Sequence, residues 1–150
     1  MKSRDMTPAI IKDFGAHFVP GGTLLHANET AERSNSIDRA LLAQLGVNID
    51  SQAKMPDVAL YCPNRNRLLL IESVTSHGPI DEKRRAELSR LFANSKADLV
   101  FISAFPNRAT MALHLSDIAW ETDVWVADSP SHLIHFKGER LAGPYAASPK

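Results

Sequence analysis

Apolar residues along the chain alternate between a helical and an extended spacing, which predicts helices and strands in turn. In the N-terminal part, Ile10, Ile11 and Phe14 recur at the helical spacing. Up to residue 46 the pattern predicts a helix at 7–18, a strand at 23–27, a polar loop at 28–35, and a helix at 37–45 that Ser36 caps and Gly46 ends.

Two apolar runs in the middle of the chain flank a turn and predict a β-hairpin. The first strand runs over 58–61 and the second over 68–74, and the segment CPNRNR between them carries the Pro and Asn residues that favour a reversal. With the turn centred between Asn64 and Arg65, Asp57 lies directly opposite Glu72 on one face of the sheet.

A pair of carboxylates in this position has an electrostatic cost. Directly opposed residues have Cβ atoms roughly 5 Å apart, and two charges at that distance repel by about 3 kcal/mol at an effective dielectric constant of about 20. Glu72 also follows four consecutive aliphatic residues, a run typical of a strand buried on both faces. Three explanations stay open: a shared proton, a basic partner such as Arg65 or Arg67, and a divalent cation such as Mg²⁺, which prefers oxygen ligands.

The second half of the chain continues the alternation. The pattern predicts a helix that opens with Pro79 and Asp81 and runs to about residue 93, a strand at 99–103, a helix at 107–115, and strands at 124–127 and 133–136. A helix that connects two strands of a sheet joins parallel neighbours, whereas a hairpin is antiparallel. We therefore expect an α/β fold with a mixed central sheet flanked by helices, in a single domain over residues 1–150.

Several short segments resemble, in the same order, those of one enzyme family. They are PDV at 56–58, LIESVTSHGP at 70–79, KRR at 83–85, FPNRAT at 105–110, SDIAWET at 116–122, HLIHF at 132–136 and GPY at 143–145. Over about residues 45 to 145 the chain resembles the catalytic half of the BsuBI/PstI family of type II restriction endonucleases, within the PD-(D/E)xK nuclease superfamily. The resemblance implies a restriction-endonuclease-like core with the element order αβββαβ.

The same resemblance implies Mg²⁺-dependent hydrolysis of phosphodiester bonds in double-stranded DNA. Asp57, Glu72 and the backbone carbonyl of Ser73 would hold the metal, which lowers the pKa of a bound water and stabilises the transition state. The superfamily pattern expects a lysine two residues after Glu72, on the same face of the strand. This chain has Val74 there, so another residue must supply the positive charge.

Two residues are candidates for the part that the missing lysine plays. If Leu88 faces the core, Arg84 lies about 40° from it on the helix and Lys83 points roughly 140° away, at about 100° per residue. Arg84 is therefore expected to reach the site and hold the scissile phosphate. His77 follows Glu72 by a few residues and titrates near neutrality, which suits proton transfer, although a role in a turn before the helix is the alternative.

Net charge does not indicate DNA binding, because 17 basic and 17 acidic residues cancel. Affinity for DNA would come from local clusters, since each phosphate that a cation neutralises releases counterions. The predicted DNA-binding residues are Lys83, Arg84, Arg85 and Arg108. A solvated helix face is the alternative explanation of the cluster at 83–85.

The remaining histidines and aromatic residues carry weaker signals. His132 and His135 are three residues apart, which places them on opposite faces of a strand rather than in a metal-binding pair. Surface positions are expected for three further histidines, namely His17, His26 and His114. Core positions are expected for the aromatic residues in or beside apolar strands, namely Phe101, Trp120 and Trp125.

Length and the nature of the termini set the expectations about location and partners. No segment is apolar enough for a membrane span or a signal peptide, which predicts a cytoplasmic protein. The resembled family carries a further N-terminal DNA-binding half, which we expect this chain to lack; a stand-alone nuclease, a subunit with a separate DNA-specificity partner and a remnant all stay open. Cutting a palindrome such as the family's CTGCAG would require a two-fold homodimer.

The alternative function is a non-catalytic DNA- or protein-binding module, which Val74 and zero net charge favour.

Overall fold

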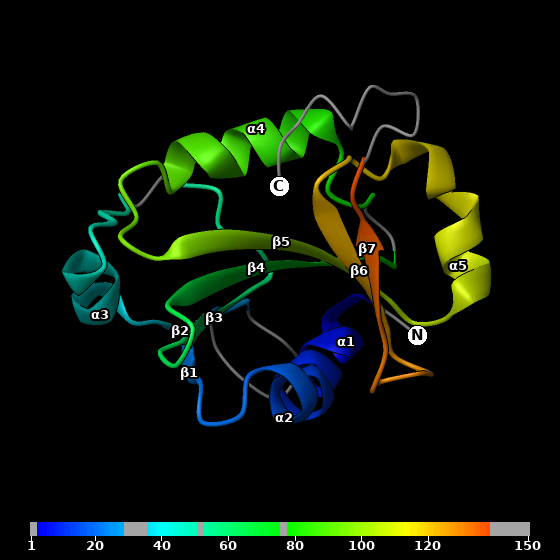
Figure 1. Ribbon diagram of the computed structural model, residues 1–150, viewed down its shortest axis with the longest axis horizontal. Helices are drawn as coiled ribbons and strands as arrows, with labels where there is room; N and C mark the ends of the chain where they lie inside the picture. The colour runs from blue at the N-terminus through cyan, green and yellow to red at the C-terminus, as the bar shows by residue number, and fades with distance from the viewer. Residues whose placement is uncertain (1–2, 29–35, 51–52, 76–77, 139–150) are drawn as a thin grey trace, which may run out of the picture.

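Among the residues that the structure describes, a seven-stranded mixed sheet forms the centre of the computed structural model, with the strand order β2-β1-β3-β4-β5-β6-β7 (Figure 1). The structure describes residues 3–28, 36–50, 53–75 and 78–138. Its strands are β1 (Thr23–Ala27), β2 (Ser36–Ile37), β3 (Val58–Cys62), β4 (Arg67–Ser73), β5 (Asp98–Phe105), β6 (Thr122–Val126) and β7 (Leu133–Phe136). The predicted mixed sheet is confirmed, and β1 and β7 have the predicted bounds.

Helical segments cover the sheet and connect its strands. They are α1 (Ser3–Ala9), the π-helical η1 (Ile10–Phe14), α2 (Gly15–Phe18), α3 (Arg39–Gln44), α4 (Glu82–Leu91), α5 (Arg108–Leu113) and the 3₁₀-helical η2 (Leu115–Asp117). In the part of the chain that the structure describes, none of the helices is long and apolar enough to cross a bilayer.

Two helix starts differ from the prediction. The first helical segment begins at Ser3 rather than at residue 7, and it continues through Pro8 into a π-helical turn. Ser36 does not cap α3, because it pairs in the short strand β2. The cap is Asp38, whose side chain accepts a hydrogen bond from the Leu41 N–H at 3.0 Å. Aspartate and serine are about equally good helix caps. The helix therefore starts later than predicted because residues 36 and 37 pair in β2, which leaves Asp38 as the cap.

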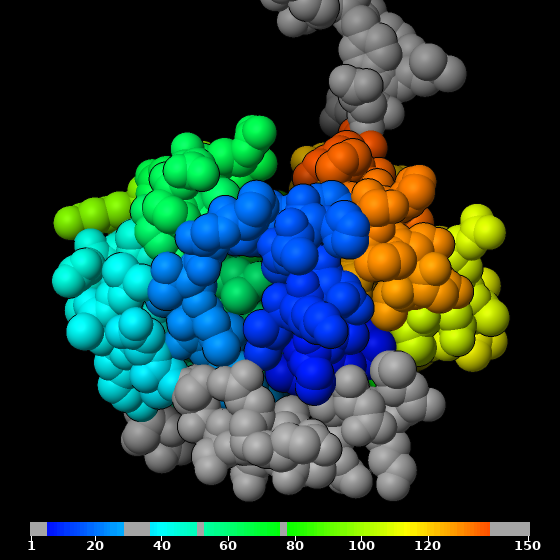
Figure 2. All heavy atoms as spheres, turned by 90° about the horizontal axis from the view of Figure 1, so that it is seen from below, coloured from blue at the N-terminus to red at the C-terminus, as the bar shows by residue number. Residues whose placement is uncertain are grey.

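Helices cover both faces of the sheet. On one face, Met6, Ile10 and Phe14 are fully or almost fully buried against β3, β4, β5 and β6. Figure 2 shows this first helical segment in blue across that face, with α3 in cyan on one side and the C-terminal strands in orange on the other. On the opposite face, α3 and α4 bury Leu42 and Leu88 against β1, β3, β4 and β5.

β4 lies in the middle of the sheet, which explains its apolar sequence. Leu69 and Ile71 belong to the cluster under the first helical segment, and Leu68 and Leu70 to the cluster under α3 and α4. Because both faces of β4 are covered, the strand is apolar until Glu72. Glu72 continues the alternation on the face that α4 covers.

The strand directions bring the ends of several strands to one edge. β4, β5 and β6 are parallel, with α4 and α5 in the connections, so the predicted parallel neighbours are confirmed. β3 and β4 are antiparallel in the predicted register, with Val58 opposite Ile71 and Leu60 opposite Leu69. The residues just before β3 therefore meet the carboxyl ends of β4 and β5.

Burial confirms some of the expectations for aromatic residues and histidines and overturns others. Phe101 and Trp125 are buried, as predicted. Trp120 is 59% exposed and lies against Phe136, so its predicted core position is wrong; it precedes β6 instead of belonging to it. His26 is 4% exposed, so its predicted surface position is also wrong. The reason is that β1 has a neighbouring strand on each side and a covered face.

Candidate active site

Four polar residues lie in one row across the sheet, at the edge where β4 and β5 end. The β1–β3 register, extended by one residue, sets Asn28 opposite Asp57, and the β3–β4 register, extended likewise, sets Asp57 opposite Glu72. Glu72 in turn pairs with Ser103 of β5. Since paired residues share a face of a sheet, all four belong to the face that α4 covers.

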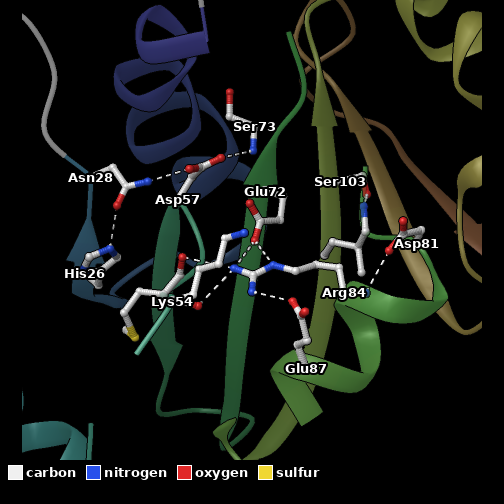
Figure 3. Close-up of polar contacts among 12 residues, drawn as sticks. His26, Asn28, Lys54, Asp57, Glu72, Ser73, Asp81, Arg84, Glu87 and Ser103 are labelled. Atoms are coloured by element: carbon white, nitrogen blue, oxygen red, sulfur yellow. Dashed lines mark hydrogen bonds and ion pairs between the residues drawn. The ribbon is translucent and has the colours of Figure 1, made fainter. Parts of the chain in front are cut away.

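Asp57 is held by hydrogen bonds at both carboxylate oxygens (Figure 3). The backbone N–H of Ser73 donates to Oδ2 at 2.7 Å, and the side-chain amide of Asn28 donates to Oδ1 at 2.5 Å. The Asn28 backbone N–H also donates to the Asp57 carbonyl at 2.9 Å. Asp57 is thus oriented from both neighbouring strands.

Glu72 is hard to ionise where it lies. Its side chain is 15% exposed, and its pKa is raised from 4.5 to about 7, first by burial and then by the negative charge of Asp57. The guanidinium of Arg84 acts in the opposite direction and lowers the pKa. The positive charge of Arg84 therefore does not fully offset the burial of Glu72 and its repulsion from Asp57.

Arg84 reaches Glu72 from the first turn of α4. Its Nη2 and Nε lie 2.7 and 2.8 Å from one oxygen of Glu72, while Nη1 lies 3.3 Å from Glu87. Nη2 also donates to the backbone carbonyls of Lys54 and Met55, at 3.2 and 3.1 Å. The guanidinium thus ties α4, β4 and the segment before β3 together (Figure 3).

Two local contacts fix the start of α4. Asp81 caps the helix by accepting a hydrogen bond from the Arg84 N–H at 2.8 Å. The Ile80 N–H donates to the Ser103 hydroxyl at 2.9 Å. Because Ser103 is the β5 neighbour of Glu72, the same row of the sheet positions both the acid and the helix that carries its cation.

The cation at this site comes from α4 and not from β4. Val74, at the position where the superfamily pattern has lysine, is fully buried in an apolar cluster with Phe105 and Val124. Arg84 points to the acid pair, whereas Lys83 is exposed on α4. The helical projection from the sequence is confirmed for these two residues.

The other predicted DNA-binding residues lie apart from the acid pair. Arg85 lies over the ring of Phe101, 5.4 Å from its centroid, and lines a cavity of about 750 Å³ that includes Arg67 at the far end of β4. Arg108 is the exposed first residue of α5 and lines a cavity of about 310 Å³ with His132. The structure brings only Arg84 among the predicted cations into contact with Glu72.

The histidines that were considered for chemistry do not join the site in the part of the chain that is described. His77 lies outside the described residues. His132 and His135 contact different partners: His132 lies 3.1 Å from the Ser131 hydroxyl, and His135 Nδ1 lies 2.7 Å from Asp123.

Sequence reasoning missed Asn28, His26 and Ser103. Nε2 of the buried His26 lies 3.0 Å from the Asn28 side-chain oxygen, behind Asp57. Pairing the predicted strand at 23–27 with the hairpin would have been the signal for Asn28. The register shift between Leu24 and His26 is not visible in the sequence, so that pairing could not be placed from it.

The donor set of this site suits a hard divalent cation. Asp57 and Glu72 present carboxylate oxygens side by side, and the negative charge is only partly offset by Arg84. Among the described residues, no group of three or more acidic, cysteine or histidine side chains gathers into a metal site. Two carboxylates with a backbone carbonyl and water match the sparse oxygen coordination that Mg²⁺ takes in nucleotide-processing sites.

Residues 2–139 match the family model of the BsuBI/PstI restriction endonuclease domain. The chain belongs to the BsuBI/PstI restriction endonuclease family. It is 57% identical over 141 residues to the type II restriction enzyme BsuBI of Bacillus subtilis. It is 30% identical over 139 residues to the type II restriction enzyme AplI of Arthrospira platensis. These matches cover 94% and 88% of this chain, but 45% and 43% of those enzymes.

The fold of this BsuBI/PstI-family chain is also that of a solved relative. The structure of the SdaI restriction endonuclease matches with a TM-score of 0.86 and 38% identity, over 97% of this chain and 46% of that one. The expected restriction-endonuclease-like fold is therefore confirmed. The chain spans about half the length of the relatives that it matches.

Proposed function

We propose that this chain is the nuclease domain of a type II restriction endonuclease, which uses Mg²⁺ to hydrolyse phosphodiester bonds of double-stranded DNA in a restriction-modification system. One observation carries the proposal: Asp57 and Glu72 lie side by side at the end of a buried strand, with Arg84 as the adjacent cation. Family membership supports it, because the similar proteins BsuBI and AplI are type II restriction enzymes.

Asp57, Glu72 and the backbone carbonyl of Ser73 are the proposed metal ligands. Mg²⁺, when bound, supplies a water of lowered pKa and positive charge for the transition state. The chain's own contribution is orientation: the N–H of Ser73 and the amide of Asn28 hold the Asp57 carboxylate in one position. Glu72 must lose its proton to act as a ligand, so its pKa of about 7 makes ligation depend on pH near neutrality.

Arg84 is proposed to hold the scissile phosphate. An arginine stays protonated and presents several N–H donors in a plane, which suits two phosphate oxygens. Its carbonyl contacts to Lys54 and Met55 hold the guanidinium beside Glu72 before any substrate binds. Such a preorganised charge stabilises the negative charge that develops on the phosphorus oxygens. His77 stays a proposed proton-transfer residue.

DNA contacts outside the acid pair are proposed for Lys83, Arg85 and Arg108. Lys83 and Arg108 have the better positions, because α4 begins and β5 ends at the edge of the sheet that holds the acids. Arg85 would contact DNA only if the duplex extended to the other end of β4. With zero net charge, we propose that site recognition also needs a homodimer or a separate DNA-specificity part, and that the protein acts in the cytoplasm.

Incubation of supercoiled plasmid with the purified chain tests the proposal. Nicked or linear DNA should form with Mg²⁺ and not with a chelator in its place. Asp98 gives a matched control, because it is exposed and begins β5 at the opposite end of the sheet from the pair, so Asp98→Asn should cut like the wild type. Plasmid that stays supercoiled at all Mg²⁺ and protein concentrations would refute nuclease activity of this chain.

A non-catalytic binding module is the second candidate, and the ion pair between Arg84 and Glu72 favours it. This pair gives the buried acid a structural partner, so Glu72 does not require a metal in order to be tolerated. In that case the chain would bind DNA or a protein without cutting. A binding titration beside the plasmid assay separates the two functions.

A further inference from the structure

A short chain of hydrogen bonds runs from Asp57 into β1 (Figure 3). The amide nitrogen of Asn28 donates to Asp57 Oδ1 at 2.5 Å, and His26 Nε2 lies 3.0 Å from the Asn28 side-chain oxygen. His26 is buried and Asn28 is half-buried, so water competes little for either bond.

The chemistry of the three side chains fixes which group donates and which accepts in each of these two hydrogen bonds. A carboxylate accepts hydrogen bonds and does not donate them, so the amide nitrogen of Asn28 faces Asp57 and its oxygen faces His26. The ring nitrogen that meets this oxygen must then carry a proton, because an amide oxygen also accepts. His26 therefore holds Asn28 in the orientation that presents a donor to Asp57.

Backbone pairing places the same three residues rigidly. The Asn28 N–H donates to the Asp57 carbonyl at 2.9 Å. This bond continues the β1–β3 ladder by one position beyond the pair of Ala27 and Val58. On the other side, the Ser73 N–H donates to the second oxygen of the Asp57 carboxylate. The Asp57 carboxylate thus accepts one hydrogen bond from the β1 side and one from β4, and it cannot rotate without breaking one of them.

We propose that Asn28 is a positioning residue for Asp57, that His26 acts through Asn28, and that the two set the affinity of the acid pair for Mg²⁺. The inference rests on the proposed function, because it takes Asp57 as a metal ligand. Groups that orient a ligand without touching the metal contribute about 10- to 100-fold to metal affinity or activity.

Calorimetric titration of the full chain with Mg²⁺ alone, without DNA, tests the role of Asn28. Asn28→Ala should weaken Mg²⁺ binding by about 10- to 100-fold. DNA cleavage by this variant should fall at low Mg²⁺ and recover at high Mg²⁺, because the defect lies in metal affinity. Asn66→Gly is the control: Asn66 also makes two side-chain bonds, to Tyr61 and Lys96, at the other end of the hairpin, and glycine accepts its positive φ. Its Mg²⁺ affinity should equal that of the wild type.

The role of His26 is tested by a double-mutant cycle. His26→Phe keeps a ring in the buried position and removes the donor, and we expect a smaller loss of Mg²⁺ affinity than in Asn28→Ala. Because His26 acts through Asn28, the double variant should bind Mg²⁺ no more weakly than Asn28→Ala alone. Additive losses would overturn this part. If Asn28→Ala does not fold, His26→Phe alone tests the inference: it should bind Mg²⁺ more weakly than the wild type, and equal affinity would overturn the inference.

The outcomes separate this inference from the proposed function. If Asn28→Ala binds Mg²⁺ within about twofold of the wild type, below the 10-fold expected of a positioning group, the inference is wrong whether or not the chain cuts DNA. If the wild type binds Mg²⁺ through Asn28 but cuts no DNA, the inference stands and the nuclease proposal falls. A wild type that binds no Mg²⁺ overturns both.

Discussion

Two nitrogens of Arg84 contact the same oxygen of Glu72, Oε2, at 2.7 and 2.8 Å. These contacts engage one oxygen of the carboxylate and not the other. Glu72 can therefore keep its ion pair with Arg84 and still offer Oε1 to a metal ion. One guanidinium thus favours the ionised form of the acid and lies next to the proposed site of the phosphate.

The first prediction compares Arg84 with its neighbour in sequence. Arg84→Ala should lower the single-turnover rate of DNA cleavage by about 10²- to 10³-fold, the usual effect of removing a preorganised donor at a transition state. Lys83→Ala should weaken DNA binding but change the single-turnover rate of bound DNA little, because Lys83 is exposed on α4 whereas Arg84 contacts Glu72. Circular dichroism should show that both variants fold. A larger loss for Lys83→Ala would mean that Lys83 is the residue that replaces the missing lysine.

Asp57→Asn should separate metal binding from DNA binding. The amide keeps the size of the side chain but removes the charge that a divalent ion needs. Mg²⁺-dependent cleavage should be lost, while DNA binding without metal should persist or tighten, because one negative charge near the phosphates is gone. Gel assays of cleavage and binding measure both. Cleavage by this variant at the wild-type rate would refute the role of Asp57.

Glu72 should make stability depend on pH in a defined direction. Its pKa is raised from 4.5 to about 7, so between these values the folded chain binds more protons than the unfolded chain. Stability contributed by the protonated form is complete below about pH 4.5 and is lost as pH rises through 7. The cost of the ionised form above that pH is on the order of 3 kcal/mol.

Glu72→Gln cannot ionise and should not show this cost. The difference in Tm between this variant and the wild type should shift in favour of the variant as pH rises from about 5 to about 8. On the scale of a domain of this size, the shift should be on the order of 5 to 10 °C. Thermal unfolding at several pH values measures it, with Glu87→Gln as control. A difference that stays constant with pH would contradict the raised pKa.

Placing a lysine at Val74 should not restore a superfamily-like site. Val74 is fully buried among apolar side chains, so Val74→Lys would place an ammonium group in the core. We expect a loss of stability on the order of 3 kcal/mol or more in chemical unfolding. Val74→Ile, which adds only a methylene, is the control. In the Arg84→Ala background, Val74→Lys should not recover cleavage; recovery would show that the strand can still carry the cation.

Local patterns in the sequence were sufficient for the acid pair, and together with the family resemblance they also indicated Arg84, rather than Arg65 or Arg67, as its cation. The turn between β3 and β4 is short, so its centre fixed the register that sets Asp57 opposite Glu72. The 3.6-residue period of α4 likewise distinguished Arg84 from Lys83. Both inferences depend only on residues that are close in sequence.

Tertiary structure alone decided the surroundings of that pair. His26 was expected at the surface but is buried, and Trp120 was expected in the core but is exposed. Asn28 meets Asp57 only because β1 pairs with β3 across a register shift. Burial and pairing of this kind depend on which distant segment covers a residue, and neither the identity of a residue nor its local spacing contains that information.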